Sequence, residues 1–129
     1  MPWWKSILAT INEGDVLQTP GTVNGARRKT FTVLLKEALV IRIGSGSSII
    51  NMERECFDAV ETAFNQNPSL WLRVASVHAK EPLPDSADKL IREATGSHLA
   101  RGNYVCAILE HCGLVKYSRK GRWKVIVLH

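Results

Sequence analysis

Basic side chains gather near the C-terminal end of this chain, in a pattern suited to binding an anion. Five cations lie within nine residues, and no acidic residue interrupts them: Lys116, Arg119, Lys120, Arg122 and Lys124. Lysine and arginine form charge-assisted hydrogen bonds with phosphate oxygens, and a dense run of one sign attracts polyanions. The sequence therefore predicts a phosphate-binding segment. The alternative is a solvated surface hairpin without a ligand.

The net charge of +5 is concentrated in the same region. Residues 1–64 hold seven cations and seven acids, whereas residues 97–129 hold six cations and one acid. A polyanion would therefore be drawn to the C-terminal end of the chain. The 129 residues, of which 45 % are hydrophobic and 22 % charged, are typical of a folded domain and suffice for one good core.

Just before the basic run, residues 97–112 carry polar side chains that suit nucleic acid. On a helical wheel, Val105 and Leu109 lie on a face that we expect to be buried, and Asn103 and Tyr104 lie on the opposite side. An asparagine can pair with adenine in the major groove. Near the expected helix start, phosphate contacts are predicted for Ser97, His98 and Arg101. The alternative for these side chains is capping, packing or a solvated surface.

Enzymatic and metal-binding arrangements are not recognisable in the sequence. Three candidate acids are scattered without a partner: Asp15, Glu37 and Asp58. Three cysteines sit in helical patterns and are expected to be reduced, buried thiols: Cys56, Cys106 and Cys112. No C-x-x-C or H-x-x-x-H spacing offers tetrahedral zinc ligands. The sequence therefore favours a protein that is not an enzyme, with no metal and no cofactor.

The elements that must position the basic residues follow in a readable order. Residues 51–64 have helical spacing with Asn51 as the expected N-cap, and residues 71–77 are expected to be extended. A second helix follows Ser86 and ends at Gly96, a third spans about residues 97–112, and residues 114–128 are strand-like. Gly102 lies inside the third helix. Either that helix begins later, or Gly102 lets another helix approach closely.

This order of elements resembles the winged helix-turn-helix family over residues 51–128. The resemblance also rests on the run 107–115, where a helix closes at Gly113 and passes directly into a strand. It implies a recognition helix over residues 97–112 and a basic hairpin wing, with duplex DNA as the partner. A two-residue turn at Lys120–Gly121 would set Arg119 opposite Arg122, and a bound phosphate would relieve that repulsion. Trp123 would pack inward or stack on a sugar or base.

The N-terminal half is predicted to be a helix and a small β-meander that support the C-terminal half. Its opening segment is helical up to about Gly14, with Trp3 and Trp4 on the apolar face. Both indoles either pack on the rest of this chain or bind a protein partner or a second copy. Strands are expected at residues 30–35, 39–43 and 48–50, which form a small antiparallel meander.

Together these observations predict an α+β fold in one compact globular body. Residues 1–50 would form the N-terminal helix and β-meander, packed against a winged-helix unit of residues 51–129. The expected function is DNA binding, as a regulator or accessory subunit. The alternative is a protein-interaction module on the same scaffold, without nucleic acid. No apolar run is long enough to cross a bilayer, so a cytoplasmic protein without a membrane partner is expected.

Overall fold

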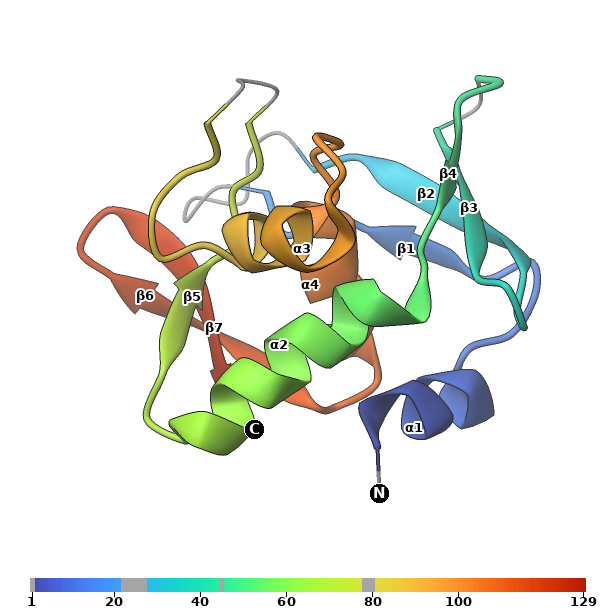
Figure 1. Ribbon diagram of the computed structural model, residues 1–129. Coiled ribbons are helices and arrows are strands. Elements are labelled where there is room, and N and C mark those ends of the chain that lie inside the picture. Colours follow the sequence, from blue (N-terminus) through green and yellow to red (C-terminus); the bar gives the residue numbers. More distant parts are fainter. Residues whose placement is uncertain (1, 22–27, 45, 78–80) are drawn as a thin grey trace.

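The computed structural model describes residues 2–21, 28–44, 46–77 and 81–129, which form four helices and two antiparallel sheets (Figure 1). The helices are α1 (Trp3–Thr10), α2 (Arg54–Gln66), α3 (Ala87–Thr95) and α4 (Gly102–His111). The first sheet is ordered β1 (Val16–Gln18), β2 (Thr30–Leu35), β3 (Val40–Ile43), β4 (Ile49–Asn51). The second is ordered β5 (Trp71–Arg73), β7 (Trp123–Leu128), β6 (Val115–Lys120). The mixed α+β class predicted from the sequence is confirmed.

The β1–β4 sheet is the predicted meander with one more strand. Alternate residues of β2 and β3 are buried, Phe31 and Val33 on one strand and Ile41 on the other, because successive side chains point to opposite faces. The extra strand β1 pairs Leu17 with Phe31. Three residues between turn signals carry too little periodicity to mark a strand in sequence.

One hydrophobic core joins the N-terminal and C-terminal parts of the chain. Its buried side chains come from both sheets and all four helices, including Ile7 of α1, Phe57 of α2 and Ile126 of β7. Figure 1 shows α2, α3 and α4 between the β2–β4 strands and the second sheet, α1 below β2–β4, and the turn of the β6–β7 hairpin on the side away from β2–β4.

The helix pair α3 and α4 differs from the prediction at one boundary. Ser86 caps α3 by accepting a hydrogen bond from the Lys89 N–H at 3.1 Å, and Gly96 closes it at φ +69°, as the sequence indicates. However, α4 begins at Gly102 and not at Ser97. Asp88 of α3 accepts hydrogen bonds from the backbone N–H groups at the start of α4. A cap supplied by another helix leaves no local signal in the sequence.

Two further helix ends differ from the prediction, because residues next to them pair with strands of the N-terminal sheet. Helix α1 ends at Thr10, because the next residues turn back and Gly14 donates its N–H to Val33 O of β2 at 2.7 Å. Asn51 does not cap α2: it ends β4, where it pairs with Val40, and the helix begins at Arg54. None of the helices in the described part of the chain has the length and apolarity to cross a bilayer.

The N-terminal tryptophans pack on this chain. Trp3 is buried with its ring centroid 6.0 Å from that of Phe64, and half-buried Trp4 lies 5.6 Å from Phe57. Both contacts hold α1 against α2. The predicted partner-binding role is therefore wrong for Trp3, which has no exposed indole to offer, and the packing alternative is the one observed.

All three cysteines are free thiols, as the sequence indicates. Cys56 and Cys106 are buried, whereas Cys112 is half-buried. Burial raises the pKa of Cys56 to about 12 and that of Cys112 to about 11, and it raises the pKa of Cys106 as well. Because the thiolate is the reactive form, burial disfavours reaction of these side chains near neutral pH.

Candidate nucleic-acid interface

The β6–β7 hairpin carries the predicted basic residues, with its turn one residue later than expected. Gly121 and Arg122 form the turn, and Gly121 adopts φ +59° at its first central position, a conformation that favours glycine. Lys120 then pairs with Trp123, and Arg119 pairs with Lys124. The predicted pairing of Arg119 with Arg122 is wrong. Like charges nevertheless face each other, which is destabilising in the absence of an anion.

Four of the five hairpin cations are exposed. Arg119 Nε donates a hydrogen bond to Gly121 O at 2.7 Å, which holds that guanidinium at the turn. Lys116, Lys120 and Arg122 are likewise exposed, and neither β6, β7 nor their turn contains an acidic residue. The hairpin therefore presents exposed positive charges at its turn and on both of its faces, Lys116 and Lys120 on one and Arg119 on the other.

The fifth cation, Lys124, has a structural contact instead. It is half-buried, and its Nζ donates to Pro20 O at 2.8 Å while lying 4.8 Å from the centre of the Tyr117 ring. Burial lowers the pKa of Lys124, and the positive charge of Arg28 adds to this effect. Lys124 therefore ties the hairpin to the segment after β1, and in this conformation it does not extend the exposed basic surface.

The third strand of this sheet adds two residues that the sequence did not single out. Trp71 and Arg73 of β5 lie on the same face as Lys120 and Trp123. The Arg73 guanidinium lies 4.4 Å from the centre of the Trp123 ring, Arg122 lies 5.1 Å from it, and Lys120 Nζ lies 6.0 Å from the Trp71 ring. The two-residue spacing of Trp71 and Arg73 is a weak signal for a shared face. Their neighbour β7 could not be inferred from sequence.

Helix α4, predicted to contact DNA bases, is covered by the N-terminal sheet. Tyr104 is only 6 % exposed and meets Phe31 of β2 edge to face, with centroids 5.3 Å apart. Asn103 donates its backbone N–H to Ser76 Oγ at 2.8 Å, and its side-chain Oδ1 is buried. The base-reading prediction is therefore wrong for Tyr104, because packing against Phe31 covers its ring. Asn103 is half-buried, and its base-reading role stays a prediction.

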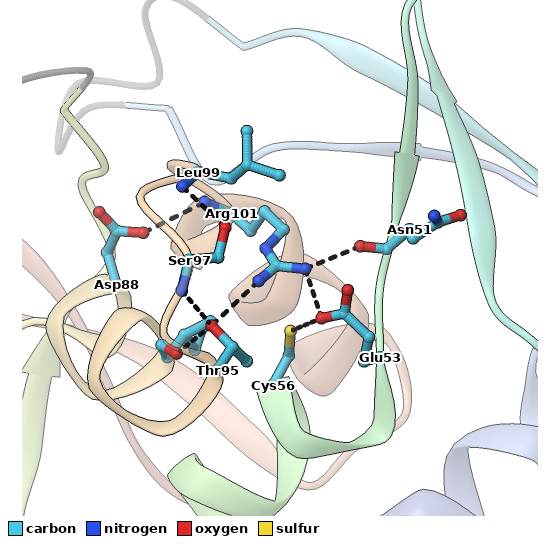
Figure 2. Close-up of polar contacts among 9 residues, drawn as sticks. Asn51, Glu53, Cys56, Asp88, Thr95, Ser97, Leu99 and Arg101 are labelled. Carbon is cyan, nitrogen blue, oxygen red and sulfur yellow. Dashed lines mark hydrogen bonds and ion pairs between the residues drawn. The ribbon is translucent and has the colours of Figure 1, made fainter.

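Arg101, predicted to contact phosphate, lies inside the protein (Figure 2). Its side chain is 1 % exposed, and Nη1 donates to Glu53 Oε2 at 2.6 Å and to Asn51 O at 2.9 Å. Nη2 donates to Thr95 Oγ1 at 3.2 Å. The guanidinium thus joins the end of β4, the start of α2 and the end of α3. This arrangement contradicts the predicted phosphate contact.

Replacing Arg101 with lysine is expected to change stability and not nucleic-acid affinity. An ammonium cannot reproduce the planar fork that reaches three acceptors at once, so Arg101→Lys should lower the free energy of unfolding by about 1–3 kcal/mol. Chemical denaturation followed by circular dichroism measures this. The matched variant Arg122→Lys, at an exposed turn, should unfold like the wild type. If the folded Arg101→Lys variant bound nucleic acid more weakly than the wild type, Arg101 would have to be a contact residue after all.

Ser97 and His98 lie on the loop between α3 and α4. Ser97 Oγ accepts a hydrogen bond from the Leu99 N–H at 3.2 Å, and Ser97 N–H donates to Thr95 Oγ1 at 3.3 Å. His98 is exposed. Figure 1 places this loop above the helices and the β6–β7 hairpin to their left, so the two predicted contact regions do not merge into one surface.

Of the residues predicted to contact nucleic acid, five are exposed: Lys116, Arg119, Lys120 and Arg122 of the hairpin, and His98 of the loop between α3 and α4. Among the residues that the structure describes, no group of three histidine, cysteine or acidic side chains is arranged to hold a metal ion. Comparisons with protein-family models, with curated proteins and with solved structures gave no match to this chain.

Proposed function

We propose that this protein is a DNA-binding module that holds the phosphate backbone of a duplex with its β6–β7 hairpin. The observation that carries the proposal is the exposure of Lys116, Arg119, Lys120 and Arg122 on strands that contain no acid. Phosphate contacts supply most of the affinity of non-specific DNA binding. Because intracellular DNA would be the ligand, the cytoplasmic location expected from the sequence is part of this proposal.

The arrangement of elements supports a winged-helix interpretation of residues 51–128. They follow in the order α2, β5, α3, α4, β6, β7, and the sheet order β5–β7–β6 returns the last strand to the middle. In this interpretation α4 corresponds to the recognition helix and the β6–β7 hairpin to the wing. The order of the elements and of the strands therefore supports the resemblance to the winged-helix family that the sequence indicates.

The N-terminal sheet limits which part of that scaffold can contact DNA. Packing of Tyr104 against Phe31 keeps α4 out of a major groove, so direct reading of base edges is not part of the proposal. Binding through the hairpin alone is governed by charge and depends strongly on salt. We therefore expect little sequence preference.

Neutralising the hairpin tests the proposal. In the variant Arg119→Ala, Lys120→Ala, Arg122→Ala, duplex affinity at low salt should fall steeply. The slope of log K against log salt should flatten by up to about 2.7, because each phosphate contact contributes about 0.9. Fluorescence anisotropy with a labelled duplex of arbitrary sequence, repeated over a series of salt concentrations, measures both quantities.

A matched control removes three exposed cations from elsewhere on the surface. Lys5 of α1, Arg42 of β3 and Lys89 of α3 are all exposed and lie outside the β5–β7–β6 sheet. Their triple alanine variant has the same net charge as the hairpin variant, so the comparison separates local contact from overall charge. Equal affinities and slopes for the two variants would refute binding by the hairpin.

A protein-interaction module is the second candidate, favoured by the edges of the N-terminal sheet. The outermost strands β1 and β4 leave their outer backbone groups without a strand partner among the described residues. They also expose apolar side chains, Val16 at 63 % and Ile49 at 60 %. An extended peptide can add to such an edge. Absence of DNA binding at low salt together with a stable hetero-complex would favour this function.

A further inference from the structure

The face of the β5–β7–β6 sheet that points away from the helices has an unusual composition. Cross-strand partners share a face and alternate residues return to it, so its members follow from the register. They are Trp71, Arg73, Lys116, Ser118, Lys120, Trp123, Val125 and Val127. We call this set the aromatic–basic face. The opposite face carries Leu72, Val115 and Ile126, which belong to the hydrophobic core.

Cations and indoles alternate on the aromatic–basic face without any carboxylate. Trp71 and Trp123 are half-buried, so each residue keeps part of its surface accessible. Lys120 pairs with Trp123 across the strands, and its Nζ lies 6.0 Å from the Trp71 ring. Lys120 thus lies opposite Trp123 in the register and near the Trp71 ring. The face offers aromatic surfaces for stacking beside positive charges for phosphates.

Arg73 of this face and Arg122 of the adjoining turn lie against the Trp123 ring, and neither forms an ion pair with an acid in the described part of the chain. Arg73 and Arg122 lie 4.4 and 5.1 Å from the centre of the Trp123 ring. Exposed cation–π contacts are weak, about 0.5–1 kcal/mol, so the exposed Arg122 can leave the ring at little cost. Two positive groups at one ring also repel each other. A phosphate next to the ring would relieve this repulsion.

We propose that the aromatic–basic face binds an unpaired strand of nucleic acid, with bases stacked on Trp71 and Trp123 and phosphates held by Arg73, Lys120 and Arg122. A duplex would supply phosphates for the cations but no bases for the indoles, because its bases are already stacked and paired inside the double helix. An unpaired strand satisfies both, since every base has a flat face for an aromatic side chain. The inference rests on the proposed function and narrows its ligand to unpaired nucleotides, alone or next to a duplex.

Affinity measured over a salt series separates stacking from charge. The full-length protein is titrated with labelled oligo(dT) and oligo(rU) of about 15 nucleotides and with a blunt DNA duplex of about 20 base pairs. Trp71→Ala and Trp123→Ala should each weaken single-strand binding by roughly 5- to 150-fold. The salt slope should not change, because no charge is removed. Affinity for the duplex should be unaffected.

Conservative and remote substitutions serve as controls. Trp71→Phe and Trp123→Phe keep a stacking ring and should retain most of the single-strand affinity, which also covers the case in which an alanine variant does not fold. Trp4→Phe, at a half-buried indole on α1, should bind like the wild type. Equal binding by oligo(dT) and oligo(rU) would identify unpaired nucleotides in general as the ligand, and a difference would assign DNA or RNA within that class.

The outcomes distinguish this inference from the proposed function. If folded Trp71→Ala and Trp123→Ala variants bind oligo(dT) as the wild type does, or lose duplex and single-strand affinity equally, the stacking proposal is overturned while backbone binding by the hairpin stands. If the wild type binds neither the duplex nor the single strands at low salt, the proposed function itself fails. Preferential loss of single-strand affinity supports both.

Discussion

Asp88→Ala is expected to lower the free energy of unfolding by about 3–5 kcal/mol, the usual consequence of removing one partner of a buried ion pair. Asp88 is 1 % exposed, and its Oδ2 lies 2.9 Å from Arg92 Nη2, whose side chain is 6 % exposed. Its Oδ1 accepts the N–H groups of Arg101 at 3.1 Å and Gly102 at 3.2 Å. Alanine would leave the charge of Arg92 and two backbone donors without this carboxylate. Denaturant unfolding followed by circular dichroism measures the loss.

A second aspartate–arginine pair provides the control for this prediction. Asp58 also pairs with an arginine four positions away, Arg54, at 3.1 Å, but the two side chains are 41 % and 53 % exposed. Solvent screens such a pair, so Asp58→Ala should cost at most about 0.5 kcal/mol. Asp88→Asn keeps an acceptor for the two N–H groups, so its loss of stability should lie between those of Asp88→Ala and Asp58→Ala. A cost for Asp88→Ala no larger than that for Asp58→Ala would contradict the structural role given to Asp88.

Local patterns in the sequence predicted the elements whose signals are local. Serine at the start of α3 and a left-handed glycine at its end placed that helix correctly, because both act within one turn of it. The start of α4 could not be placed in this way, since its cap comes from Asp88, fourteen residues before Gly102. The three-residue strand β1 likewise depends on pairing with β2, not on its own periodicity.

The candidate site was predictable in its charge but not in its burial. Lys116, Lys120 and Arg122 are exposed where the spacing indicates, because charged side chains on a surface hairpin are mostly solvated, whereas Lys124 of the same hairpin is half-buried. Arg101 and Tyr104 have the same polar signature in sequence, yet Glu53 and Phe31 cover them from segments about 50 and 70 residues away. Which polar helix face remains exposed is decided by long-range packing, which composition does not encode.

The contribution of β5 to the site was missed for the same reason. Trp71 and Arg73 belong to the aromatic–basic face only because the last strand of the chain inserts between β5 and β6. Their partners in the register are Val127 and Val125, more than 50 positions away. A single sequence gives no indication of that pairing.

Gly102→Ala is expected to destabilise the protein by about 3 kcal/mol or more, because the helix pair leaves no room for a methyl group. A Cβ at this position would lie 2.7 Å from both the Cβ and the backbone N of Asp88, and 2.8 Å from its Cα. Overpacking typically costs about 1–3 kcal/mol, and backbone atoms cannot give way as a flexible side-chain end can. The gain of about 1 kcal/mol in helix propensity would not offset this. The two helices must separate, which also breaks the Asp88 cap on α4.

Gly46→Ala provides the matched comparison on the loop between β3 and β4. Its added Cβ would meet only Ile43 O at 4.0 Å, and its φ lies outside the left-handed range, so alanine fits there without strain. Alanine gives the unfolded chain less conformational freedom than glycine does. The free energy of unfolding of this variant should therefore be unchanged or higher by about 0.4–1 kcal/mol. Denaturant unfolding of the two variants side by side therefore separates close helix contact from a general effect of replacing glycine. Equal stabilities of Gly102→Ala and Gly46→Ala would contradict the close approach of α3 and α4, on which the placement of Asp88 and Arg101 depends.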